Sequence, residues 1–185
     1  MKMTEIRIHC RGGRGGVTAA RILGLAAVRE GKHALAFPSF TVERRGAPIM
    51  AFVRISEEEI LDRSFIYNPD YVLIFDPGLL NHPSVRVGVR EETFFLVNAS
   101  SREQAASLGV KKLAFVNASA IAHQVLGVPI VNTAMCGAFA AASKLLSFEA
   151  LEKAIREFLP SKIAGKNVEA AFRAYQEVKF IGENG

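Results

Sequence analysis

Short runs of apolar, β-branched and aromatic residues alternate with helix-length segments along this chain. Runs that are apolar throughout are typical of strands with both faces covered. The pattern predicts strands at residues 6–10, 33–37, 48–55, 71–75, 93–97 and 113–116. It predicts helices at residues 19–29, 101–108, 118–126, 133–146, 148–158 and 167–178. Two capping boxes support these boundaries: Ser56-x-x-Glu59 predicts a short turn or helix, and Ser100-x-x-Glu103 predicts a helix start.

Strands that alternate with helices favour a right-handed, mostly parallel sheet between two helical layers. We therefore predict a three-layer α/β/α fold with a Rossmann-like sheet. Residues 34–55 differ from this pattern, because two strands follow each other there and predict a β-hairpin. Since no internal repeat and no Pro-, Gly- or Ser-rich linker divides the chain, residues 1–185 are expected to form a single domain.

Composition narrows the functional classes. Half of the residues are apolar and 22% are charged, which argues against extended disorder. The net charge of +5 comes from basic residues scattered along the sequence, so nucleic acid is not an expected partner. Apolar stretches are too short to span a membrane, and the N-terminus alternates as a strand does. We expect a cytoplasmic protein without a membrane partner.

The residue types that carry chemistry form no recognisable catalytic or metal-binding pattern. Cys10 and Cys136 are far apart in sequence and cannot hold a zinc ion or an iron–sulfur cluster, so each is predicted to be a small buried residue. The four histidines lack metal-ligand spacing, and His9 and His123 are more typical of structural residues. No catalytic residue and no metal ligand is therefore expected.

A glycine-rich turn follows the first predicted strand and precedes a helix. Its backbone N–H groups and the positive end of the helix dipole would suit a phosphate or a carboxylate. The candidate anion-binding residues are Gly12, Gly13, Arg14, Gly15, Gly16 and Thr18. The turn matches neither common nucleotide fingerprint, because Thr18 stands where G-x-G-x-x-G needs its third glycine and no Lys-Ser or Lys-Thr pair follows.

Three polar residues end predicted strands: Asp76, Asn98 and Asn117. Ligands of open α/β sheets bind at the carboxyl ends of the strands, which makes these side chains candidates for ligand contact. Asn and Asp at such places are more often helix caps or turn formers. Capping is the favoured interpretation for Asn98 and Asn117, and the two alternatives are balanced for Asp76.

The segment at residues 37–48 combines two aromatic residues, two prolines and three adjacent charges. A stiff loop that presents arginines beside aromatic side chains loses little entropy on docking, which favours a partner interface over a solvated turn. The candidate interface residues are Phe40, Glu43, Arg44 and Arg45.

Several blocks together resemble one family. They are residues 12–15, 18–20, 36–38, 43–48, 51–55, 69–70, 76–77 and 132–139. With these residues the chain resembles the gamma subunit of 2-oxoacid:ferredoxin oxidoreductases, which act on pyruvate, 2-ketoisovalerate or 2-oxoglutarate. The resemblance covers nearly the whole chain, and Glu-Arg-Arg-Gly-Ala-Pro at residues 43–48 is its most specific part. Arg14, Gly16 and Thr41 depart from the glutamine, the valine or alanine, and the glycine that are common in this family.

The resemblance implies a subunit of a heteromeric enzyme that oxidatively decarboxylates a 2-oxoacid to an acyl-coenzyme A and reduces ferredoxin. It implies alpha and beta parts that hold thiamine diphosphate with Mg, and a ferredoxin-like delta part that holds [4Fe–4S] clusters. This chain alone would bind no cofactor and would be inactive, with coenzyme A (CoA) as a co-substrate of the complex. The glycine turn would suit either a phosphate of CoA or a carboxylate of a partner chain. The alternatives are an autonomous CoA- or dinucleotide-binding module and a basic nucleic-acid-binding accessory protein.

Overall fold

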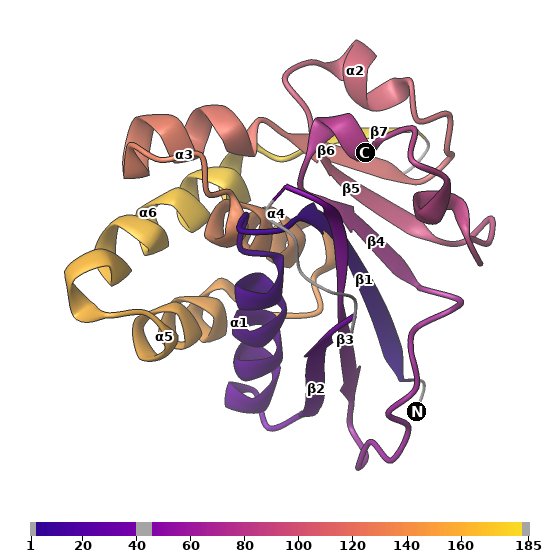
Figure 1. The fold of residues 1–185 in the computed structure, drawn as a ribbon. Helices are drawn as coiled ribbons and strands as arrows, with labels where there is room; N and C mark the ends of the chain where they lie inside the picture. Colours follow the sequence, from indigo (N-terminus) through magenta and orange to yellow (C-terminus); the bar gives the residue numbers. More distant parts are fainter. Residues whose placement is uncertain (1–2, 40–45, 183–185) are drawn as a thin grey trace.

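The computed structural model describes residues 3–39 and 46–182 and is built around a seven-stranded sheet of order β2-β3-β1-β4-β5-β6-β7 (Figure 1). The strands are β1 (Thr4–Arg11), β2 (His33–Pro38), β3 (Pro48–Ser56), β4 (Tyr71–Ile74), β5 (Phe94–Asn98), β6 (Leu113–Val116) and β7 (Lys179–Ile181). Strands β3 and β7 run against the direction of the others, and β2 pairs with β3 in an antiparallel register. The α/β class, the mostly parallel sheet and the hairpin are confirmed.

Helices cover the two faces of the sheet unequally. They are α1 (Gly16–Arg29), α2 (Arg102–Ala106), α3 (Ala118–Leu126), α4 (Asn132–Ser143), α5 (Phe148–Phe158) and α6 (Ser161–Glu177), with short 3-10 segments η1 (Pro77–Leu79) and η2 (Pro83–Arg86). Helices α1 and α3–α6 lie on one side, and α2 lies on the other side with the 3-10 segments, over β4–β6 (Figure 1). None of the helices described is long and apolar enough to cross a membrane.

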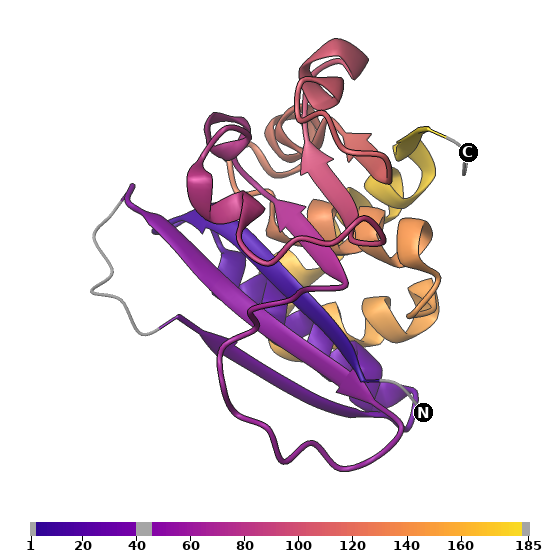
Figure 2. The same cartoon turned by 90° about the vertical axis from the view of Figure 1, so that its right-hand side faces the viewer.

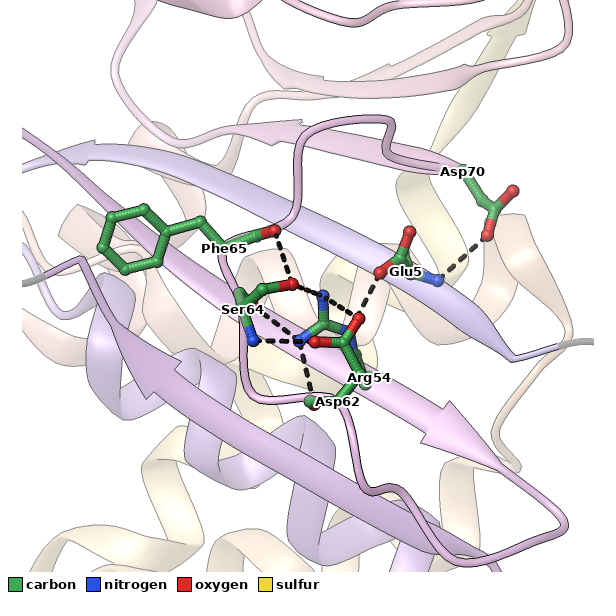
Figure 3. A network of polar contacts seen from close by, with 6 residues as sticks. All are labelled: Glu5, Arg54, Asp62, Ser64, Phe65 and Asp70. Atoms are coloured by element: carbon green, nitrogen blue, oxygen red, sulfur yellow. Dashed lines mark hydrogen bonds and ion pairs between the residues drawn. The ribbon is translucent and has the colours of Figure 1, made fainter.

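An irregular segment, residues 57–70, replaces the second helical layer over β3 (Figure 2). Arg54 on β3, whose side chain is 1% exposed, anchors this segment (Figure 3). Its guanidinium donates to the carbonyl oxygens of Asp62 at 3.1 Å and Ser64 at 2.7 Å, and it pairs with Glu5 on β1 at 2.9 Å. The Phe65 ring stacks on Phe52 at a centroid distance of 5.3 Å. Aromatic packing and a buried cation thus cover this face without a helix.

The alternation along β1 sends its side chains to two different environments. Ile6, Ile8 and Cys10 are buried in the core against the helices. Arg7 and His9 point to the opposite face, where both are 2% exposed. The core under β4–β6 is a separate cluster that includes residues of η1 and α2.

The sequence pattern misplaces some boundaries. The strand β7 was not predicted, because three residues are too short to show alternation; it pairs with β6 and places Phe180 beside Phe94. Helix α6 begins six residues before its predicted start, at Ser161 rather than at 167. Ser101, not Ser100, caps α2 by accepting from the amide of Gln104. After Ser56 there is a turn and no helix, with the Ser56 hydroxyl accepting from the Glu58 amide.

Candidate anion-binding turn

The glycine-rich turn lies between β1 and α1, as the sequence predicts. Gly13 and Gly15 adopt left-handed conformations, with φ of +79° and +82°, which glycine tolerates without strain. Gly13 has no atom within 4 Å of the position that a Cβ would take, so its surroundings are open. Helix α1 begins at Gly16, three residues earlier than predicted.

The N-terminus of α1 has no side-chain cap within the described part of the chain. Its N-cap residue is Gly15, which has no side chain to accept from the first amides of the helix. These amides therefore keep their donors available, and the helix dipole adds partial positive charge at the same place. This combination suits a phosphate or a carboxylate group.

Gly12 connects this turn to the segment that follows the predicted interface loop. Its amide donates to the carbonyl of Ala47 at 2.9 Å, and its carbonyl accepts from the amide of Gly46 at 3.2 Å. Gly12 therefore fixes the turn against Gly46 and Ala47 and has no free amide for a ligand. The structure thus brings together two of the blocks that carry the family resemblance.

Arg14 and Thr18 lie on the outer side of the turn. Arg14 is exposed and donates through Nη1 to the carbonyl of Pro129 at 3.2 Å, which links the turn to the loop before α4. Thr18 is the third residue of α1 and is half-buried. Both residues are within the candidate site, but Arg14 has a protein partner already.

Asn132, the first residue of α4, was not predicted as a site residue. A Cβ at Gly15 would lie 2.9 Å from Asn132 Nδ2, so the amide side chain packs directly against the turn. Its Oδ1 accepts from the Thr133 amide, which orients Nδ2. The family resemblance of residues 132–139 was the one signal that could have identified it.

Gly16 is confined by Cys10. A Cβ at Gly16 would lie 2.1 Å from Cys10 Sγ, a distance that no side chain can accept. The thiol therefore occupies the space that a valine or an alanine would fill at this position, which gives a steric reason for that departure from the family pattern. Arg11, at the end of β1, forms an ion pair with Asp76 at 3.0 Å.

The polar residues at the strand ends have structural partners. Asp76 accepts from the Gly78 amide at 2.7 Å as the N-cap of η1, in addition to its ion pair. Asn117 caps α3 by accepting from the amide of Ala120 at 3.0 Å. Asn98 is buried and donates to the carbonyl of Phe75 at 2.9 Å and to the hydroxyl of Ser119. The capping interpretation is confirmed for Asn117, and Asn98 joins β5 to β4 and α3.

No group of three or more His, Cys, Asp or Glu side chains within residues 3–39 and 46–182 could hold a metal ion. Cys10 and Cys136 are buried, as predicted, and burial raises the pKa of the Cys136 thiol well above its usual range. The predicted interface residues Phe40, Glu43, Arg44 and Arg45 lie outside the described residues, as does Thr41.

The fold and the turn define a class of protein: an α/β protein with an uncapped glycine turn at the carboxyl edge of its sheet and no metal-binding cluster in its described part. Comparison with known proteins then identifies its family. Residues 5–177 match the model of the pyruvate ferredoxin/flavodoxin oxidoreductase family, so the chain belongs to that family.

Curated relatives cover the chain almost completely. The chain is 48% identical over 97% of its length to pyruvate synthase subunit PorC of Methanothermobacter marburgensis, and the match covers 100% of that protein. It is 44% identical to the pyruvate/ketoisovalerate oxidoreductases common subunit gamma of Pyrococcus furiosus, over 96% of this chain and 98% of that one. The resemblance to gamma subunits is confirmed.

A solved structure of a relative has the same fold. Pyruvate oxidoreductase subunit PORC (EC 1.2.7.1) of Thermotoga maritima has a TM-score of 0.85 and 36% identity, with 97% of this chain and 99% of that chain covered. The chain therefore shares its fold and family with subunits of multi-subunit oxidoreductases.

Proposed function

We propose that this chain is the gamma subunit of a cytoplasmic 2-oxoacid:ferredoxin oxidoreductase. The complex would oxidatively decarboxylate a 2-oxoacid, transfer the acyl group to CoA and pass two electrons to ferredoxin. The observation that carries this proposal is the near-complete coverage, in both directions, of relatives named as PorC or gamma subunits. An autonomous cofactor-binding module finds no support among them.

In this proposal the redox chemistry belongs to the alpha, beta and delta partners. Thiamine diphosphate with Mg and the [4Fe–4S] clusters need carboxylate, carbonyl or clustered thiolate ligands. The two cysteines of this chain are far apart in sequence and both are buried. These cysteines do not fit a [4Fe–4S] cluster, and in this proposal the chain contributes shape, interface and a contact with CoA.

An anaerobic pull-down of the tagged full chain from its native cells tests the subunit proposal. We expect a brown complex with thiamine- and cluster-bearing chains, stoichiometric iron and thiamine diphosphate, and CoA-dependent reduction of ferredoxin with one or more 2-oxoacids. A colourless chain recovered alone, which binds CoA or NAD by itself, would contradict the proposal and favour the autonomous module.

We further propose that the turn at residues 12–18 binds a phosphate group of CoA. The first amides of α1 would donate to the phosphate oxygens, and the open surroundings of Gly13 allow a close approach of the ligand. Arg14 would add positive charge at the rim while it keeps its bond to Pro129. Gly12 and Asn132 would hold the turn in position and Thr18 would supply a hydroxyl.

Two substitutions at Gly13 distinguish backbone shape from side-chain bulk. Gly13→Val is strained at a φ of +79°, whereas asparagine tolerates this conformation better. In the assembled complex we expect Gly13→Val to raise the KM for CoA by about tenfold, equivalent to about 1.4 kcal/mol, and Gly13→Asn to have a smaller effect. The KM for the 2-oxoacid should not change. An unaltered KM for CoA in a fully assembled Gly13→Val complex would remove this role from the turn.

A further inference from the structure

A cavity lies on the face of the sheet opposite α1, between β1, the start of β3 and the two 3-10 segments. Its volume is about 160 Å³, and its lining includes the polar residues His9, Ser39, His82 and Ser84 and the apolar residues Met50 and Leu79. Sites for drug-sized ligands usually measure roughly 300–1,000 Å³. This cavity therefore suits a ligand of only a few heavy atoms, and it is separate from the glycine turn.

A buried positive charge lies beside this cavity. The Arg7 guanidinium is 2% exposed and donates to His9 Nε2 at 2.9 Å and to the carbonyl of Val85 at 3.2 Å. No carboxylate within the described ranges forms an ion pair with it. A buried arginine normally has an anionic partner, because an unpaired charge is costly to remove from water. The charge of Arg7 is therefore unbalanced by the described part of the protein.

His9 connects that charge to the cavity. Because His9 Nε2 accepts from Arg7, a neutral imidazole carries its proton on Nδ1. Burial, together with the positive charge of Arg7, lowers the pKa of His9 to about 3, so the ring is neutral at physiological pH. The described residues contain no fully buried side-chain nitrogen or oxygen without a partner. Nδ1 has no partner among them and is therefore not fully buried, so the cavity that His9 lines is the space in which its N–H can meet a ligand.

Other donors line the same cavity. His82 Nδ1 accepts from the Ser84 amide at 3.3 Å and lies 2.8 Å from its hydroxyl, which leaves Nε2 as the donor of this ring. The Ser39 hydroxyl accepts from the Met50 amide at 3.2 Å and keeps its own proton for a further bond. The apolar walls include Met50 and Leu79, and a low local dielectric strengthens interactions between donors and an anion.

We propose that this cavity is a binding site for a small oxyanion, such as the carboxylate of a short-chain acid or inorganic phosphate. The ligand would accept from His9 Nδ1, the Ser39 hydroxyl and His82 Nε2, and its charge would balance Arg7. It would bind on the other face of the sheet from the glycine turn, so both sites can be occupied together. This site does not depend on the role proposed for the turn.

Imidazole resonances of the full-length chain test this site directly. Long-range ¹H–¹⁵N correlation spectra would be recorded while sodium phosphate, sodium acetate or sodium pyruvate is added, with sodium chloride at matched ionic strength as the control. We expect saturable shifts of His9 and His82 with at least one oxyanion and no such shifts at His33 and His123, which are exposed elsewhere. The arm with the lowest half-saturation concentration identifies phosphate or carboxylate as the preferred ligand.

Two variants and one control make the test decisive. His82→Phe removes a donor and fills space, and should weaken binding at least tenfold, while Ser39→Ala removes one neutral hydrogen bond and should weaken it about threefold to tenfold. His123→Phe, on α3, is the matched control and should bind as the parent chain does. If His82→Phe does not fold, Ser39→Ala still decides. Shifts that stay linear with every salt, or that move all four histidines alike, would overturn the proposal.

Discussion

Cys10 and Gly16 show how one side chain decides the conformation next to the site. The thiol of Cys10 takes the space above the first residue of α1, so that position accepts only glycine. Glycine is otherwise a poor choice within a helix, where alanine is favoured by about 1 kcal/mol. The strand and the helix therefore fit each other through a small residue on one side and a sulfur atom on the other.

This fit predicts a strong coupling between two substitutions. Gly16→Ala alone should lower the free energy of unfolding by about 1–3 kcal/mol, because the new methyl group overlaps Cys10 Sγ. Cys10→Ala removes the sulfur atom, so the double variant should be more stable than the sum of the two single effects by about 1 kcal/mol or more. Urea unfolding of the parent chain, the two single variants and the double variant gives the four free energies of unfolding that this double-mutant cycle compares. Strict additivity would contradict the steric account.

His9 predicts a pH dependence of stability. Its pKa is about 3 in the folded chain and near 6.5 when unfolded, so between these values the unfolded state binds more protons. The free energy of unfolding must therefore fall as the pH falls from about 6.5 towards 3, by about 1.4 kcal/mol per pH unit from this residue.

The variant His9→Gln isolates this effect, because glutamine can still accept from Arg7 and does not titrate. Between pH 7 and pH 4.5 the parent chain should lose about 2–3 kcal/mol more than the variant. Denaturant unfolding at both pH values gives this difference, from which the carboxylates common to both proteins cancel. If the free energy of unfolding falls equally in both proteins between pH 7 and pH 4.5, His9 becomes protonated in the folded chain as readily as in the unfolded chain, which would contradict the lowered pKa.

The sequence identified some residue roles and missed others for a physical reason. The capping role of Asn117 follows from local chemistry, since an Asn before a helix accepts from the amide three residues later. Asn132 and Arg7 could not be assigned in this way. Asn132 contacts Gly15, more than a hundred residues earlier, and Arg7 donates to the carbonyls of Ser84 and Val85 in η2. Only the tertiary structure brings these residues together.

At the scale of elements, the irregular segment 57–70 covers the face of β3 that a helix would otherwise cover. Arg54 ties it to β3 and β1 through bonds that come from one guanidinium, two of them to backbone carbonyls (Figure 3). Periodicity could not predict this layer, because the segment has no regular structure to create a period. Strands β1–β6 and most helices were predictable, since each carries its own apolar run, alternation or helical spacing along the sequence, whereas the three residues of β7 are too few to show a pattern.

Replacing Arg54 should therefore release this segment. Arg54→Met leaves Glu5 without its cation and two carbonyls without a donor, and we expect a loss of about 3–5 kcal/mol in the free energy of unfolding. Arg54→Lys should recover little, because an ammonium cannot reproduce the planar fork of donors.

Hydrogen exchange would locate the effect. Amides of residues 57–66 should exchange faster in Arg54→Met than in the parent chain, with a smaller change in β4–β6. Arg156→Ala, which removes an exposed ion pair between successive turns of α5, is the control and should cost no more than about 0.5 kcal/mol. Equal protection of residues 57–66 in the parent and in Arg54→Met would show that aromatic packing alone holds the segment.

At the scale of the whole molecule, the glycine turn and residues 46–47 are joined through the backbone of Gly12. Gly46 and Ala47 directly follow Glu43, Arg44 and Arg45 in the sequence. The turn therefore lies beside residues 46–47, at the edge of the sheet where β1 ends and β3 begins. A partner subunit that docks on residues 46–47 would approach the glycine turn, which couples the proposed CoA contact to assembly.

Arg44→Ala/Arg45→Ala should accordingly release this chain from its complex. Arginines at interfaces often contribute more than 2 kcal/mol each, and a loss of about 3 kcal/mol would weaken association by more than a hundredfold. Size-exclusion chromatography of complexes reconstituted with the variant measures this loss. Arg156→Ala/Arg173→Ala, which removes two exposed arginines from α5 and α6 at the same change in charge, is the matched control and should assemble normally. If both double variants assemble like the parent chain, the arginine block does not form the interface; if both fail, net charge rather than these two side chains drives association.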